Sequence, residues 1–143
     1  MNENNKDVRS KLFNMFYPMD HDWMNYVILD DILTFHHIIK EEDGGNYVVD
    51  NGAILTQRAH TYLHYIEKID KDIFNEINIV LKRINESRQE PSYNDRLKIE
   101  LLLYEFELKN CDRIIKKKEK IKKNDRAKVA TLRRIRSQLG ENI

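Results

Sequence analysis

Apolar and polar residues follow a pattern in the first part of the chain that predicts a short helix and then a strand. Residues 5–17 place apolar side chains on one helical face, and Pro18 is expected to end that helix. Residues 17–26 are rich in aromatic side chains and turn formers, so we expect a loop packed on the core. Residues 32–39 are dense in β-branched and aromatic side chains, which is typical of a strand.

The middle of the chain predicts a second strand that leads into a helix. Residues 40–46 are charged and end in Gly-Gly, which indicates a loop. Asn51 and Gly52 form a strong turn signal, and residues 53–56 then have the pattern of a short strand. From Gln57 onward the apolar residues follow helical spacing. Together these segments predict a unit in the order strand, loop, strand, helix.

Two longer helices are predicted next. Apolar spacings of three and four predict a helix over residues 71–87, and Ser92 with Asp95 resembles a capping box for the following helix. That helix begins near Tyr93 and runs at least to Ile115. Its apolar seam is close to a heptad pattern and consists of Leu97, Leu101, Tyr104, Leu108, Cys111 and Ile115. The short link between the helices favours an antiparallel hairpin, although the seam also suits a second copy of the chain, that is, a homodimer through residues 97–115.

Composition limits the class of protein. The chain has 143 residues, of which 41% are hydrophobic and 34% charged, so we expect an α+β fold, mostly helical, with a modest core. No apolar run approaches the ~20 residues that a membrane-spanning helix needs, and the N-terminal residues lack the apolar core of a signal peptide. A single cysteine excludes an internal disulfide and a four-cysteine zinc site. We therefore expect a cytoplasmic protein. Ile, Lys and Asn are abundant, which is typical of AT-rich coding and favours a low-GC bacterium or a phage-infected bacterial cell as the setting.

The charges are distributed unevenly. Residues 1–111 contain 13 Lys/Arg and 20 Asp/Glu, a net charge of −7, whereas residues 112–143 contain 12 Lys/Arg and 4 Asp/Glu, a net charge of +8. A basic segment of this density suits capture of a polyanion, although it is also typical of a solvated helix end. The candidate nucleic-acid-binding residues in it are Lys116, Lys117, Lys118, Lys120, Lys122 and Lys123.

Candidate chemistry is concentrated between Thr34 and Glu67, which contain four of the five histidines. His60 and His64 are four residues apart on a predicted helix, so both imidazoles project from one face and can share a metal ion. No Glu follows the first of them, which excludes the HExxH metalloprotease pattern. The remaining pair, residues 36 and 37, lies on a predicted strand, where neighbours point to opposite faces. One of the pair can therefore ligate the metal while the other, with an ordinary pKa of ~6.5, takes a proton from water.

This stretch resembles the HNH, or ββα-metal, endonucleases, and most closely the all-histidine version found in colicin-type DNases. The shared features are a strand with a His-His pair, a loop with Gly-Gly, an Asn before a second strand, and a helix with H-x-x-x-H. The resemblance implies that His36, His60 and His64 are the metal ligands. It implies that His37 is the general base that activates water. The side chain of Asn51 would hold the loop between the strands and so help to orient His37.

The resemblance covers about Leu33 to Glu67 and carries further implications. It implies a ββα-metal core, which together with the N-terminal helix takes residues 1–68. The apolar spacing and the charge distribution predict the rest, a helical hairpin for scaffolding or dimerisation in residues 69–115 and a basic helical tail in residues 116–143. The CxxC pairs of many HNH proteins are absent, so packing alone must hold the core. One divalent ion is expected: Zn²⁺, Ni²⁺ or Co²⁺ by ligand softness, or Mg²⁺ or Mn²⁺ as in related nucleases.

The implied activity is hydrolysis of phosphodiester bonds in DNA, expected to be double-stranded and cleaved with little sequence specificity. Lys40 and Arg58 lie near the histidines in sequence, so they are candidates for contact with phosphate or, alternatively, solvated surface charges. Three other interpretations remain open. The first is a non-catalytic HNH-fold binding or inhibitory protein, such as a phage factor that engages a host protein or DNA. The second is a structural zinc domain, and the third is a protein in which the histidines are grouped by coincidence.

Overall fold

The structure is a computed structural model that describes residues 4–16, 19–29, 31–121 and 134. The chain divides into two compact units, Met1–Glu100 and Leu101–Ile143. All of the candidate metal ligands belong to the first unit. The functional division at residues 68 and 115 that the sequence suggested stays a prediction.

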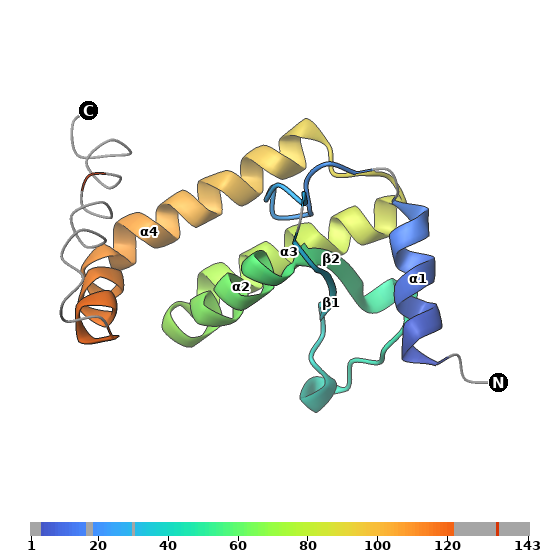
Figure 1. Ribbon diagram of the computed structural model, residues 1–143, viewed down its shortest axis with the longest axis horizontal. Coiled ribbons are helices and arrows are strands. Elements are labelled where there is room, and N and C mark those ends of the chain that lie inside the picture. The colour runs from blue at the N-terminus through green and yellow to red at the C-terminus, as the bar shows by residue number, and fades with distance from the viewer. Residues whose placement is uncertain (1–3, 17–18, 30, 122–133, 135–143) are drawn as a thin grey trace. The chain divides into compact units, whose positions relative to one another are not determined.

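The fold is α+β and mostly helical, as predicted (Figure 1). The helices and strands are α1 (Asn5–Met15), β1 (Leu33–His37), β2 (Gly52–Thr56), α2 (Gln57–Ile69), α3 (Lys71–Ser87) and α4 (Tyr93–Ile121). Two short 3-10 helices, η1 (Glu41–Asp43) and η2 (Val49–Asn51), lie in the connection between the strands. Among the described residues, no helix combines the length and the apolar character needed to span a membrane.

The two strands form an antiparallel pair that continues without a break into α2. In the register of this pair, Leu33 lies opposite Thr56 and His37 opposite Gly52. Thr56 is both the last residue of β2 and the N-cap of α2, and its hydroxyl accepts a hydrogen bond from the Ala59 N–H at 3.2 Å. No linker separates β2 from α2. The pairing of β1 with β2 therefore also determines where β1 lies relative to the first turns of α2.

The core of the first unit lies where α3 packs on α2 and β2, with α1 beside the start of β2 (Figure 1). All five residues of β2 are buried, so this strand is covered on both faces. The buried stripe of α2 consists of Ala59, Leu63 and Ile66, each with no exposed area. The facing stripe of α3 consists of Ile73, Phe74, Ile77, Val80, Leu81 and Ile84. This packing is made mostly by apolar side chains, whose burial does not depend on a metal.

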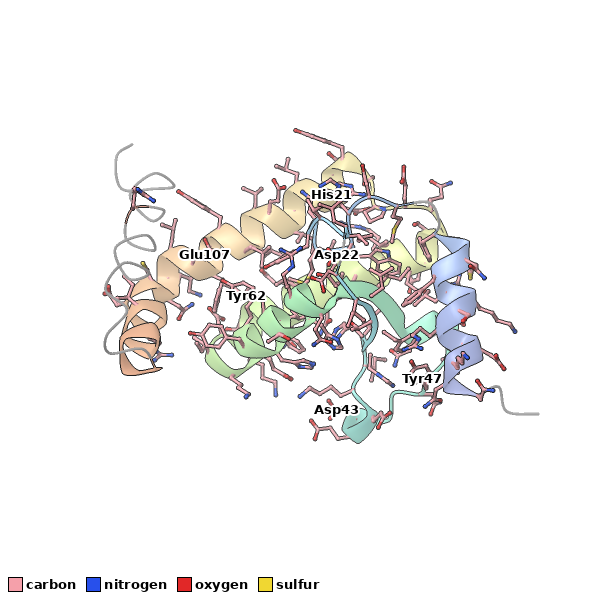
Figure 2. The ribbon with its side chains drawn as sticks, in the orientation of Figure 1. His21, Asp22, Asp43, Tyr47, Tyr62 and Glu107 are labelled. Atoms are coloured by element: carbon pink, nitrogen blue, oxygen red, sulfur yellow. The ribbon has the colours of Figure 1, made fainter. Side chains whose placement is uncertain are left out.

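The loop between α1 and β1 is fastened to the strands by one buried carboxylate. Asp22 has no exposed area, and it accepts hydrogen bonds from the backbone N–H groups of Met24 and Tyr26, both at 2.9 Å. Its other oxygen accepts from the Thr56 N–H at 2.8 Å and the Thr56 hydroxyl at 2.9 Å. Burial raises the pKa of Asp22, and these four donors oppose that shift. Figure 2 shows Asp22 in this loop, next to His21.

The last helix differs from its sequence-based prediction in the face that it buries. The capping box is confirmed, since Ser92 and Asp95 exchange hydrogen bonds at 3.2 and 3.1 Å. Of the predicted seam, Cys111 and Ile115 are buried, whereas Leu97, Leu101 and Leu108 are 40%, 55% and 43% exposed. The apolar residues that α4 buries in its first half are Ile99, Leu102 and Phe106. The run from residue 99 to 104 is apolar at nearly every position, so two stripes of the helix are apolar there. The heptad spacing predicted the stripe with Leu101, whereas the structure buries the stripe with Ile99 and Leu102. The helical hairpin and the homodimer stay predictions.

We predict that Asp22→Ala destabilises the protein by at least about 2 kcal/mol, because it leaves two buried donors at Thr56 and two more in the loop without an acceptor. Urea denaturation measures this difference. Asp20→Ala is the matched control, since Asp20 lies in the same loop and its carboxylate is 92% exposed. An equal effect of both substitutions would contradict the role assigned to Asp22.

Candidate metal centre

Side chains of β1 alternate between two environments, and this alternation separates the two adjacent histidines. Thr34 and His36 point toward α2, where both contact His60. Phe35 and His37 point to the other side, where both rings contact Tyr47. The strand therefore offers one histidine, His36, to the helix that carries the H-x-x-x-H pair.

His36, His60 and His64 converge at one point. Each offers one nitrogen to a group of atoms that all lie within 4.8 Å of one another, and this is the only group of three or more candidate ligands in the part of the chain that the structure describes. The His60 and His64 rings stack with their centroids 4.7 Å apart, as their spacing of four residues on α2 requires. The His36 ring lies 5.3 Å from that of His60 and 6.1 Å from that of His64. The three residues are thus close enough to hold a metal ion.

Two of these imidazoles, His36 and His60, are hydrogen bonded through one nitrogen, and the third, His64, has a carboxylate near one nitrogen. Nε2 of His36 is hydrogen bonded to Oδ1 of Asn78 at 2.9 Å. Nδ1 of His60 is hydrogen bonded to Oγ1 of Thr34 at 2.8 Å. Nδ1 of His64 lies 3.6 Å from Oε1 of Glu67. Partners of this kind orient the imidazoles of metal sites, so the donor set fits a divalent cation. Three imidazole nitrogens suit Zn²⁺, Ni²⁺ or Co²⁺ by softness.

The electrostatics of the centre also favour neutral ligands. Burial is the largest cause that lowers the pKa of His36 to about 3, while its hydrogen bond to Asn78 acts in the opposite direction. Burial and then the charge of His64 lower the pKa of His60 to about 4. Both imidazoles are therefore unprotonated at neutral pH and carry the lone pair that a cation needs. The side chain of His64 is 50% exposed, so the centre is open to solvent on that side.

Asn51 holds the long connection between the strands. Its side-chain oxygen accepts from the Ile39 N–H at 2.8 Å, and its amide donates to the carbonyls of Ile39 at 2.9 Å and Asn46 at 3.0 Å. The connection also requires Gly45, because a Cβ there would lie 1.8 Å from the Ile39 carbonyl oxygen. Figure 2 shows Asp43 on the turn at the tip of this connection. Asn51 ends η2 and Gly52 begins β2, so this Asn-Gly pair does not form a two-residue hairpin turn.

His37 lies at the end of β1 in an aromatic setting. Its ring is 5.1 Å from those of both Phe35 and Tyr47, which themselves stack at 4.2 Å (Tyr47 is labelled in Figure 2). Its Nε2 is buried and makes no hydrogen bond to the described residues, and the nearest acid is Glu41, with Oε1 at 3.4 Å. The charge of His37 nevertheless contributes to lowering the pKa of His36 and of His60, so it acts on the centre across the strand.

Two of the eight candidate residues for phosphate contact, Lys40 and Arg58, already form ion pairs with carboxylates. Lys40 forms ion pairs with Glu67 and with Glu42, and these partners, Glu67 first, raise the pKa of the lysine. Arg58 pairs with Asp31 at 2.6 Å, donates to a backbone carbonyl, and lies over the Tyr26 ring. Six further candidates are outside the described side chains: Lys116, Lys117, Lys118, Lys120, Lys122 and Lys123.

Two asparagines of α3 contribute to the centre and were missed by the sequence analysis. Asn78 contacts His36, and Asn85 donates at 2.7 Å to the carbonyls of both Val49 and Gly52, on either side of Asn51. A signal was present, because these two asparagines lie seven residues apart in line with the apolar stripe of α3. A polar residue in a buried stripe needs a partner, and here the partners are the candidate ligand and the loop next to it. Outside the centre, Trp23 is a fully buried core residue, and His21 is a loop residue hydrogen bonded to Asp20.

Comparison of the chain with protein-family models, with curated proteins and with solved structures finds no match in any of the three. The nuclease family that residues 33–67 resemble therefore enters below as a proposal, supported by the side chains and distances described above.

We predict that the metal-free protein loses stability as the pH falls. The unfolded chain has ordinary histidines with a pKa of ~6.5, whereas the folded values are about 3 for His36 and about 4 for His60. The unfolded state thus binds more protons below pH ~6.5, so this contribution to stability is complete above that pH and is lost toward pH 4. For His36 the slope is at most about 1.4 kcal/mol per pH unit. Urea denaturation of the chelated protein between pH 7 and pH 4.5 measures it.

The same titration with His36→Gln should give a shallower slope, because the buried imidazole is gone. His21→Gln is the control, since that histidine lies outside the centre. An unchanged slope in His36→Gln would show that His36 is not buried as a neutral group.

Proposed function

We propose that this protein is a metal-dependent endonuclease of the HNH type that hydrolyses phosphodiester bonds in DNA. The observation that carries the proposal is the convergence of His36 from β1 with His60 and His64 from α2 within 4.8 Å. The strand–loop–strand–helix order and the histidine on the neighbouring position of β1 support it. So does Asn51, whose three side-chain hydrogen bonds to the loop match the role that the family resemblance implies.

The proposed roles follow from the contacts of each residue. His36, His60 and His64 hold one divalent cation through the nitrogens that Asn78, Thr34 and Glu67 leave unused. That ion would supply positive charge to the phosphate oxygens and the leaving oxygen. His37 takes the proton from the attacking water, the water oxygen bonds to phosphorus, and the bond to the leaving oxygen breaks. Glu41, 3.4 Å from His37, stabilises the imidazolium that results.

The position of His37 fits this role although its ring faces the other side of β1. It is the last residue of the strand and directly follows the ligand His36. Rings of Phe35 and Tyr47 hold the imidazole on two sides and restrict its rotation. Nε2 lies near Glu41, so Nδ1 is the nitrogen that we assign to proton transfer. Asn51 fixes the backbone of Ile39, two residues beyond His37, and thereby limits movement of the end of the strand.

Binding of DNA is the part of the proposal that depends most on charge. Residues 1–111 are net −7, so we assign affinity for the polyanion to the segment 112–143, which is net +8. Nothing among the described side chains suggests contacts that read base edges, and we therefore propose cleavage with little sequence specificity. Affinity should fall steeply with salt because each neutralised phosphate releases counterions.

A second candidate function is supported by the acidic surroundings of the centre. Glu41, Glu42 and Asp43 form an exposed acidic turn directly after the histidine pair, and Lys40 is neutralised by carboxylates. An acidic rim opposes the approach of DNA. A non-catalytic protein that keeps the metal and binds another macromolecule would have such a surface. Cleavage assays separate the two candidates, because only the nuclease depends on His37.

We predict that His37→Ala retains metal binding and reduces plasmid nicking about 10²- to 10⁴-fold, the usual contribution of a general base. His64→Ala should lose both, and EDTA should abolish nicking by the unaltered protein. The assay is run with Zn²⁺, Ni²⁺, Co²⁺, Mg²⁺ and Mn²⁺ in turn. His21→Ala is the matched control and should cleave normally. Undiminished nicking by His37→Ala would remove His37 from the mechanism, and no nicking by the unaltered protein with any ion would favour the binding function.

We also predict that chelation empties the site without unfolding the protein. The apolar core between α2 and α3 forms without the ligands, since Ala59, Leu63 and Ile66 are fully buried against hydrophobic neighbours. Circular dichroism before and after EDTA, with metal content by mass spectrometry, checks this. Loss of helical signal on removal of the ion would identify a structural zinc domain instead.

A further inference from the structure

The hydrogen bonds around the centre determine which nitrogen of each imidazole carries the proton. A neutral imidazole has one N–H donor and one lone pair, so the partner of one nitrogen decides the role of the other. Two of the three candidate ligands have a hydrogen-bond partner that faces them with an oxygen atom. These partners are Thr34 on β1 for His60, and Asn78 on α3 for His36.

Thr34 sets the tautomer of His60. Its hydroxyl has a single proton, and Oγ1 lies 2.8 Å from the carbonyl oxygen of Leu55, which can only accept. The hydroxyl proton is therefore used in that bond. Toward Nδ1 of His60, at 2.8 Å, the hydroxyl must accept. His60 thus carries its proton on Nδ1 and presents the lone pair of Nε2 to the ion.

Asn78 sets the opposite tautomer on His36. Asn78 faces Nε2 of His36 with its side-chain oxygen, at 2.9 Å, and not with its NH₂ group; in this orientation of the amide, Nε2 is the donor. His36 then presents the lone pair of Nδ1. The imidazole has little freedom to rotate out of this arrangement, because it is 2% exposed and its ring contacts those of His60, His64 and Phe74.

We propose that Asn78 is a positioning residue that holds His36 as the Nε2–H tautomer, so that the cation is bound through Nδ1 of His36 and Nε2 of His60. The inference rests on the metal centre of the proposed function and not on the nuclease reaction. Phe74, one turn before Asn78 on α3, packs against His36 and keeps this part of the helix against the imidazole. The helix is thereby part of the centre, although the strand–loop–strand–helix unit ends before it.

Zinc affinity and imidazole tautomers test this inference in the full chain. Affinity is measured by competition with a chromogenic chelator. Tautomers are read from long-range ¹H–¹⁵N spectra of metal-free protein with labelled histidine at pH 7. The variants are Asn78→Leu, which removes the acceptor, and Asn78→Asp, which keeps it. Asn75→Leu is the matched control, because Asn75 is exposed on the same helix.

Asn78→Leu should weaken zinc binding about 10- to 100-fold, the usual effect of losing a partner that orients a ligand. Asn75→Leu should bind zinc like the unaltered protein. Asn78→Asp should bind zinc at least as tightly as the unaltered protein, because it keeps the acceptor. The unaltered protein should show His36 protonated on Nε2 and His60 on Nδ1. This tautomer measurement decides the matter even if Asn78→Leu fails to fold.

Two results would overturn the inference: a folded Asn78→Leu variant that binds zinc normally, or His36 protonated on Nδ1 in the unaltered protein. Failure of the proposed function looks different. In that case zinc binding depends on Asn78 as expected, while plasmid cleavage is absent with every ion.

Discussion

His36 is an imidazole with 2% of its surface exposed, placed among β1, α2 and α3 in contact with His60, His64, Phe74 and Asn78. Burial lowers its pKa to about 3, so it is held there as a neutral group. A buried polar ring is tolerated only when its nitrogens have partners. Asn78 provides a partner for Nε2, and one nitrogen of the ring lies within 4.8 Å of nitrogens of His60 and His64. The rest of the centre depends on this one placement.

The surrounding fold holds His36 in place through contacts that are themselves buried. β2 passes directly into α2 at Thr56, so the strand that pairs with β1 also starts the helix with the other two histidines. Asp22 fastens a separate loop to the same junction through the backbone and hydroxyl of Thr56. At the other end of the sheet, the side chains of Asn51 and Asn85 donate hydrogen bonds to backbone carbonyls of the connection between the strands. The centre is therefore built on a rigid frame and not on a free loop.

Features that depend on local spacing could be predicted from the sequence. The bounds of α3 are the same in prediction and structure, and the two strands and α2 were found in the right order. The proximity of His36 to His60 and His64 was expected, because the i, i+4 pair and the strand alternation are local geometry that few alternatives can imitate. The hydrogen bonds of Asn51 to the connecting loop also agree with the implication of the family resemblance.

Contacts between distant segments could not be predicted in this way. Asn78 lies 42 residues from His36, and Asp22 lies 34 residues from Thr56, so no periodicity links the partners. The face that α4 buries was predicted only in part, because residues 99–104 offer two apolar faces and only tertiary packing selects between them. Ion pairs of Lys40 and Arg58 depend on where Glu67 and Asp31 lie in space. The helices and strands could be predicted from the sequence, whereas the hydrogen bonds and ion pairs between residues far apart in the chain could not.

The central claim is that three imidazoles share one cation. X-ray absorption spectroscopy of the zinc-loaded protein tests this claim most directly. The account predicts three imidazole nitrogens at about 2.0–2.1 Å from zinc, with no sulfur. His36→Gln should reduce the number of imidazoles by one. A zinc environment with fewer than three imidazoles, or one that His36→Gln leaves unchanged, would contradict the account.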